Sequence, residues 1–283
     1  MRNIKLRLAY DGTDFSGWQI QPGQPTVQGT LADVLERLTG CRPTIHGAGR
    51  TDAGVHAAGQ VANFQNESAL GAGELQRACN ALLPPAIRVV GSEEVALDFH
   101  ARWSALAKTY RYRIFRGPVV PPFLWRYVQH DPYPLDFDAM CEATRRFEGE
   151  HDFTSFAAST GSEEDDRERI TVRTIYRSEL VRCVGIDPQA PGEEWVFVIR
   201  GKSFLRYMVR IMVGTLLEVG RGKFSADDIP ALFAVRDRSE SGPTMPPQGL
   251  CMAEVEYEKS TDSLDRGKAR TLHEGREGCG TPI

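Results

Sequence analysis

Residues 47–57 read Gly-Ala-Gly-Arg-Thr-Asp-Ala-Gly-Val-His-Ala, and three of the first eight residues in this run are glycine. Glycine accepts a positive φ and lets other backbone approach closely, so the run predicts a shaped loop and not the interior of a helix or strand. Asp52 lies near the centre of this loop. Catalytic groups are common on loops that a rigid scaffold holds, so Asp52 is a candidate for chemistry, although an aspartate there could equally close a turn.

The sequence on either side of the loop predicts both strands and helices, which do not alternate strictly. Apolar and polar residues alternate as in strands at 4–10, 44–46, 60–64, 108–115, 171–181, 194–200 and 251–257. Helical spacing predicts helices near 26–40, 75–82, 137–147, 203–219 and 226–233, with Thr26 and Ser203 as N-caps and Gly40 as a C-terminal stop. The element order is alike in the two halves, which predicts an α+β fold with a largely antiparallel sheet and helices packed on one face. A Rossmann fold or a P-loop NTPase is not expected, because no matching glycine motif is present.

Composition places the chain among ordinary globular proteins. It has 283 residues, of which 41% are hydrophobic and 25% charged. No apolar run approaches the roughly 18 residues of a membrane span, and the N-terminus lacks a signal-peptide core. The six cysteines stand far apart with no C-x-x-C pair, which suggests neither a zinc site nor a disulfide framework. We therefore expect a cytoplasmic protein with no membrane association and no metal.

The charge pattern neither requires nor excludes a nucleic-acid partner. The net charge is −4, but much of the acid is local, in a Ser/Gly-flanked segment at 159–169 that predicts an exposed acidic loop. Positive charge gathers at 108–116 and 202–210, and a phosphate-binding face needs a local patch and not a basic total. The expected organisation is an N-terminal αβ half at 1–105 that carries the Asp52 loop, a C-terminal αβ half at 106–257, and a disordered tail at 258–283.

The loop sequence closely resembles the active-site motif of the tRNA pseudouridine synthase A family. Eight further segments resemble that family in the same order: 9–13, 15–19, 27–29, 99–102, 110–112, 152–156, 204–210 and 249–257. The resemblance runs from about residue 3 to residue 257 and leaves out the acidic segment and the tail. A lone G-R-T-D would be a weak signal, whereas nine segments in order are a specific one.

This resemblance implies a fold and an activity. The fold is two similar αβ halves that form one extended sheet with a central active-site cleft, and the assembly is a homodimer. The activity is that of an isomerase, a tRNA pseudouridine(38–40) synthase. It would convert uridine to pseudouridine in the anticodon stem-loop, at tRNA positions 38, 39 and/or 40. The reaction moves no electron and adds no group, so no cofactor is expected.

The resemblance also assigns roles residue by residue. Asp52 matches the catalytic aspartate, and a carboxylate can attack C1′ or stabilise an oxocarbenium-like centre there. Tyr110 matches the tyrosine given to proton movement, and Arg210 matches the arginine that keeps the aspartate ionised and oriented. Because the target base is stacked or paired, it must be flipped out, and Arg50 is placed to hold the vacated space or a phosphate. The expected substrate-binding residues are Arg50, Thr51, Tyr110, His56 and Phe204.

Spacing alone leaves plainer readings open. Tyr110 could be strand packing beside Tyr112, and Arg210 could be a solvated helix residue. His56, four residues after Asp52, could belong to a metal pair, but no third ligand has partnering spacing. Three aromatic residues suit a core better than a stacking platform, namely Phe153, Phe156 and Phe204.

Two other functional classes also stay open. A binding-only RNA module would have the fold without catalysis, and a carboxylate hydrolase would normally need a second acidic group beside Asp52. Product analysis separates them, since isomerisation leaves the RNA mass unchanged, hydrolysis loses a base, and binding alone alters nothing.

Overall fold

A computed structural model describes residues 1–158, 170–184 and 192–258. The acidic segment at 159–169 and the tail after residue 258 lie outside the described residues, and the predictions for them are not tested. No described helix has the length and apolar character that crossing a membrane would require.

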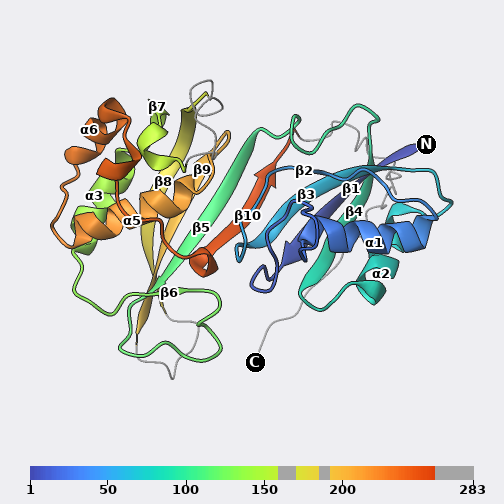
Figure 1. The fold of residues 1–283 in the computed structure, drawn as a ribbon, viewed down its shortest axis with the longest axis horizontal. Helices are drawn as coiled ribbons and strands as arrows, with labels where there is room; N and C mark the ends of the chain where they lie inside the picture. Colours follow the sequence, from blue (N-terminus) through green and yellow to red (C-terminus); the bar gives the residue numbers. More distant parts are fainter. Residues whose placement is uncertain (159–169, 185–191, 259–283) are drawn as a thin grey trace, which may run out of the picture.

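A ten-stranded sheet runs through the molecule (Figure 1). Its main path is β4-β1-β3-β10-β5-β9-β8-β7, with β2 beside β3 and β6 beside β5. Among the described pairings, only β3–β10 and β5–β6 are parallel, so the predicted largely antiparallel sheet is confirmed. The strands are β1 (Arg2–Tyr10), β2 (His46–Gly47), β3 (His56–Asn66), β4 (Ile87–Val95), β5 (Ala107–Phe115), β6 (Gln129–His130), β7 (Gly149–Asp152), β8 (Val172–Val184), β9 (Glu193–Gly201) and β10 (Leu250–Glu256).

The two halves of the sheet repeat one plan. In the first half β1 lies between β4 and β3, and in the second β5 lies between β10 and β9. Each central strand comes first in its half of the chain and runs antiparallel to both of its neighbours on the main path. The halves meet where β3 and β10 pair in parallel through Cys251↔His56 and Met252↔Ala57. The two halves are therefore alike in the placement of their first long strand, whereas β8 and β7 extend only the second half.

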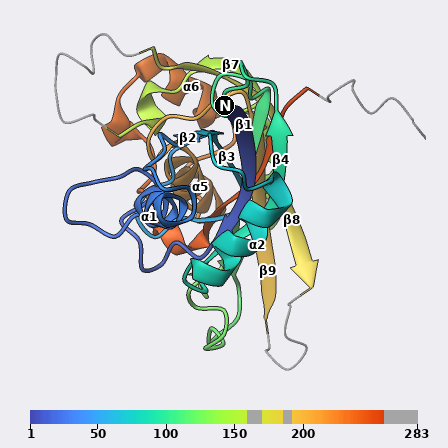
Figure 2. The same cartoon turned by 90° about the vertical axis from the view of Figure 1, so that its right-hand side faces the viewer.

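The helices cover one face of this sheet. They are α1 (Val27–Thr39), α2 (Ala72–Leu82), α3 (Phe137–Arg145), α5 (Met208–Gly220) and α6 (Asp228–Val235), with 3₁₀ turns η1 (Thr154–Phe156), η2 (Arg238–Glu240) and η3 (Pro247–Gly249). Figure 2 shows the sheet close to edge-on, with α1, α5 and α6 on the same side of it. Alternation along β1 explains why the helices pack on one face, because every second residue from Ile4 to Tyr10 is buried and these residues share that face.

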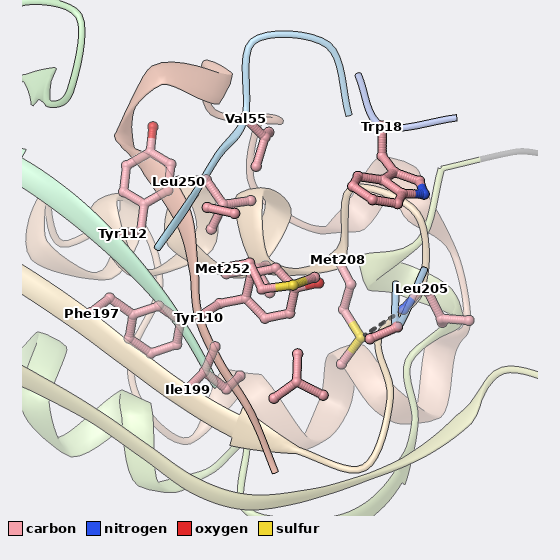
Figure 3. Close-up of a cluster of buried hydrophobic side chains, with 14 of the residues drawn as sticks. Trp18, Val55, Tyr110, Tyr112, Phe197, Ile199, Leu205, Met208, Leu250 and Met252 are labelled. Atoms are coloured by element: carbon pink, nitrogen blue, oxygen red, sulfur yellow. Dashed lines mark hydrogen bonds between the residues drawn. The ribbon is translucent and has the colours of Figure 1, made fainter. Parts of the chain in front are cut away.

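The caps of α1 are those that the sequence predicted. Thr26 accepts a hydrogen bond from the Gly29 N–H at 3.2 Å, and Gly40 ends the helix with a φ of 81°. The expected Ser203 cap is wrong, because α5 begins only at Met208. Residues 203–207 form a loop that turns Leu205 into the core, and the Leu205 N–H lies 3.5 Å from the Met208 sulfur (Figure 3). Tyr207 at the N-cap of α5 has φ 62° and ψ 1°.

A dense apolar cluster supports the junction of the halves. Figure 3 shows Tyr110 of β5 between Met252 of β10 and Ile199 of β9, which are its partners in the adjacent strands. The helix α5 contributes the buried Met208, which Figure 3 shows beside Tyr110 and Leu205. Since protein interiors are close-packed, this cluster fixes the position of the strand that carries Tyr110.

Candidate active site

The Asp52 loop is a tight turn that its glycines make possible. The Val55 N–H donates to the Asp52 carbonyl at 3.1 Å, and Gly54 inside this turn has a φ of 77°. A second loop supports the first, since the Trp18 N–H donates to the Thr51 carbonyl at 3.0 Å. A Cβ on Gly17 would lie 2.7 Å from that same carbonyl oxygen, so the two loops approach closely only because this residue is glycine.

Asp52 pairs with Arg210, 158 residues later in the chain. Arg210 Nη1 donates to Asp52 Oδ2 at 3.2 Å, and Arg210 Nε donates to the Met245 carbonyl at 2.6 Å. The side chains are 12% exposed for Arg210 and 25% for Asp52. A guanidinium with two donors engaged holds its direction better than an ammonium would. The structure therefore brings together two residues that the sequence predicted as a pair.

Burial and nearby cations act in opposite directions on Asp52. Burial raises the pKa of the Asp52 carboxyl above its usual value, and the charges of Arg210 and Arg206 lower it part of the way back. No described carboxylate contributes to this pKa. The paired acids of a glycoside hydrolase are thus not evident at Asp52 among the described residues.

Tyr207 stands between the two arginines that face Asp52. The guanidinium carbons of Arg206 and Arg210 lie 4.8 Å and 4.7 Å from the centre of its ring, and Arg206 Nη2 donates to its hydroxyl at 3.1 Å. These are cation–π distances. A left-handed backbone is costly for a tyrosine, and such strain tends to occur at functional sites. This arrangement could not be predicted from the sequence, because positive φ at a non-glycine residue has no local signature.

Tyr110 forms the floor of the site. It is 7% exposed, and its ring meets that of Phe204 edge-on at a centroid distance of 5.0 Å. Its hydroxyl makes no hydrogen bond with any residue that the structure describes. Burial, with smaller effects from Tyr10 and Asp52, raises the pKa of the Tyr110 hydroxyl well above its usual value. At neutral pH the group is a protonated phenol that is free to donate.

The remaining predicted site residues lie around this centre in different roles. Arg50 is exposed and reaches Gln19 Oε1 at 3.2 Å, whereas Thr51 is buried with its hydroxyl 2.8 Å from that of Tyr10. His56 is also buried, and its ring nitrogens face the protein. The Gly12 N–H donates to His56 Nδ1 at 3.1 Å, and His56 Nε2 lies 3.0 Å from the Arg126 carbonyl. These contacts tie three loops together.

The predicted positive patch at 108–116 is not a single surface. Alternation along β5 sends Lys108 to the face of Tyr110 and sends Arg111 and Arg113 to the opposite face. Arg113 there forms a bidentate pair with Glu194, with both N–O distances at 2.8 Å. Lys108 is the residue that sequence reasoning misplaced, although the two-residue spacing to Tyr110 would have placed it correctly.

Two further observations bear on ligands. A cavity of about 380 Å³ lies between α3 and β8, away from Asp52, and its lining includes none of the residues above. Within the described ranges, no three His, Cys, Asp or Glu side chains gather as a metal site would require.

Comparison with known proteins identifies the family. The model of the family described as tRNA pseudouridine synthase matches residues 8–104 and 143–258. A protein named tRNA pseudouridine synthase A from Solibacter usitatus is 49% identical over 257 residues, which cover 91% of this chain and 100% of the relative. Another of that name from Maridesulfovibrio salexigens is 42% identical over 281 residues, or 99% of this chain and 98% of the relative. Among solved structures, a chain of a Cbf5-Nop10-Gar1 complex matches 76% of this chain and 54% of its own length, at 12% identity and a TM-score of 0.29. The chain that carries the Asp52 loop thus belongs to the tRNA pseudouridine synthase A family, which is a family of isomerases.

Proposed function

We propose that this enzyme converts uridine to pseudouridine in the anticodon stem-loop of tRNA, at positions 38, 39 and/or 40, with Asp52 as nucleophile. The Asp52–Arg210 ion pair at 3.2 Å carries this proposal. It joins the N-terminal loop to a helix of the other half and holds one carboxylate beside a buried phenol. Family membership supports the substrate, since the relatives are named as tRNA pseudouridine synthases.

The proposed reaction needs one nucleophile and one proton shuttle. The C1′–N1 bond breaks, the uracil turns, C5 bonds to C1′, and C5 loses a proton while N1 gains one. Asp52 attacks or stabilises C1′, and Arg210 keeps its carboxylate ionised and aimed while the site is desolvated. Tyr110 exchanges a proton with the base or sugar, for which its free hydroxyl is suited.

The other residues handle the substrate. Flipping removes the target base from its stack, and Phe204 with Tyr110 offers aromatic surface to receive it. Arg50 is exposed and could enter the vacated space or meet a phosphate. Thr51 and His56 are buried and bonded within the protein, so their proposed part in substrate binding is to hold the loop that contacts the base.

The decisive experiment pairs site mapping with one substitution. Purified enzyme is incubated with unmodified tRNA transcript, and pseudouridine is mapped chemically. Asp52→Asn keeps the shape of the side chain but removes its charge, so single-turnover conversion should fall to background while tRNA affinity changes little. Comparable conversion by the Asn variant would remove Asp52 from its assigned role.

We also propose that the working form is a homodimer in the cytoplasm. A stem-loop together with the tRNA body spans more surface than one cleft offers, and the family resemblance implies two subunits. Analytical ultracentrifugation at assay concentration should give a mass twice that of the chain. A monomer with full activity would overturn the dimer and leave the assignment of the reaction intact.

A further inference from the structure

Lys108 lies beneath the Asp52 loop on the same strand face as Tyr110. One residue separates them on β5, so their side chains leave the same side of the sheet. A Cβ built on Gly49 would lie 3.7 Å from Lys108 Nζ and 3.7 Å from Tyr110 Oη. The amine and the phenol therefore approach one point of the loop that carries Asp52.

Lys108 lacks a negative partner among the described residues. It is only 8% exposed, and no ion pair or hydrogen bond joins its amine to a residue in the described part of the chain. Its neighbours across the sheet are Val255 in β10 and Gly201 in β9, which carry no charge. A buried charge without a partner is costly, so proteins seldom keep one without a use.

The described charge that acts on the Lys108 amine, that of Arg102, is also positive. Burial, and after it the positive charge of Arg102, lowers the pKa of the Lys108 amine to about 8. Arg102 is exposed, and its guanidinium lies 4.7 Å from the ring centre of Trp103, which is also exposed. A buried amine on which another cation acts, and which no described carboxylate pairs, is an arrangement that a phosphate would neutralise.

We propose that Lys108 and Arg102 form a phosphate-binding subsite for the RNA chain beside the Asp52 loop. This inference rests on the proposed function, because it takes RNA as the substrate. The subsite would hold the backbone of the flipped nucleotide, with Lys108 as the inner contact and Arg102 as the outer one. Both residues lie in or just before β5, so the strand that presents Tyr110 to the base would also fix the phosphate.

The salt dependence of tRNA binding tests the subsite. Binding constants of unmodified transcript are measured between low and physiological potassium chloride in the Asp52→Asn background, which prevents conversion. The slope of log K against log salt concentration is negative, and each lost phosphate contact should reduce its magnitude by about 0.7–0.9. Lys108→Met and Arg102→Gln should each show this loss, whereas Lys108→Arg should keep the slope.

The control is Lys223→Gln. Lys223 is 67% exposed, follows the far end of α5 and pairs with Glu218, so the slope should not change. Lys108→Met should melt at or above the parent temperature, because an unpartnered buried charge is removed. Slopes equal to the parent value in both Lys108→Met and Arg102→Gln would overturn the subsite. Absence of pseudouridine from reactions of the unmutated enzyme would instead overturn the proposed function.

Discussion

At the residue scale, the ionisation of Asp52 is a balance between burial and two arginines. Burial raises the pKa of the carboxyl, and Arg210 supplies the largest opposing effect. Tyr207 stands against both arginines, so its strained backbone has a physical use in holding cations toward one carboxylate. The pH dependence of the reaction rate should therefore be sensitive to the charge of Arg210.

We expect Arg210→Ala to lower the rate on the order of a hundred-fold or more, because it removes a preorganised charge. Without that cation the pKa of Asp52 rises further, so the carboxylate protonates at a higher pH as the solution is acidified. The acid limb of the pH–rate profile should therefore move upward in pH. Arg210→Lys should also be damaging, since one ammonium cannot serve both Asp52 and the Met245 carbonyl.

A double-mutant cycle checks the pair itself. The free energy of unfolding is measured for Asp52→Asn, Arg210→Ala and the double variant. Contact at 3.2 Å predicts an interaction free energy, which we place at about 1 kcal/mol since the carboxylate keeps part of its hydration. Strict additivity would mean that the two side chains act separately.

At the element scale, α5 is held by a close approach that no periodic pattern reveals. A Cβ on Gly214 would lie 1.8 Å from the Pro243 carbonyl oxygen, so the segment that supplies the Met245 carbonyl lies directly on this helix. Gly73 in α2 is a helical glycine with open space, where an added Cβ meets only an Arg77 nitrogen at 3.7 Å. The two positions form a matched pair.

Alanine at these glycines should have opposite effects. Gly73→Ala should raise the free energy of unfolding by up to about 1 kcal/mol, because alanine is the better helix former. Gly214→Ala has the same intrinsic preference but should lower both the melting temperature and the turnover, since it pushes residues 243–245 away from Arg210. Thermal unfolding measures the effect of each substitution on stability, and single-turnover assays measure its effect on the reaction. Equal stabilisation at the two sites would contradict the packing of α5.

The same elements show what sequence could predict and where it stopped. Local signals sufficed for α1, because Thr26 and Gly40 act through their own backbone neighbours. The start of α5 was missed since burial of Leu205 and the left-handed Tyr207 are set by tertiary packing, which overrides the Ser203 signal. The Asp52–Arg210 pair was predicted only through family resemblance, because no spacing rule links residues 158 positions apart.

At the scale of the whole molecule, the last described strand joins the two halves. β10 lies between β3 and β5, and Met252 packs against Tyr110 (Figure 3). A chain that ends at Glu258 keeps every described strand. In addition, 91% of this chain is enough to match one relative over its whole length. Truncation after Glu258 should leave the melting temperature and the conversion of uridine unchanged. Truncation after Gly249 should instead abolish both the cooperative thermal unfolding and the conversion. Loss of activity on removing residues 259–283 alone would contradict this expectation.

The position of β10 also has a consequence in time. Translation delivers Asp52 early, Arg210 much later, and β10 among the last of the described elements. Domains fold as their residues emerge from the ribosome, so the first half has its own strands and helices available well before the junction strand. A nascent chain would carry Asp52 through most of its synthesis without Arg210 and β10. Because β10 is the last described strand, the halves of the sheet can pair only after nearly all of the described chain has been made.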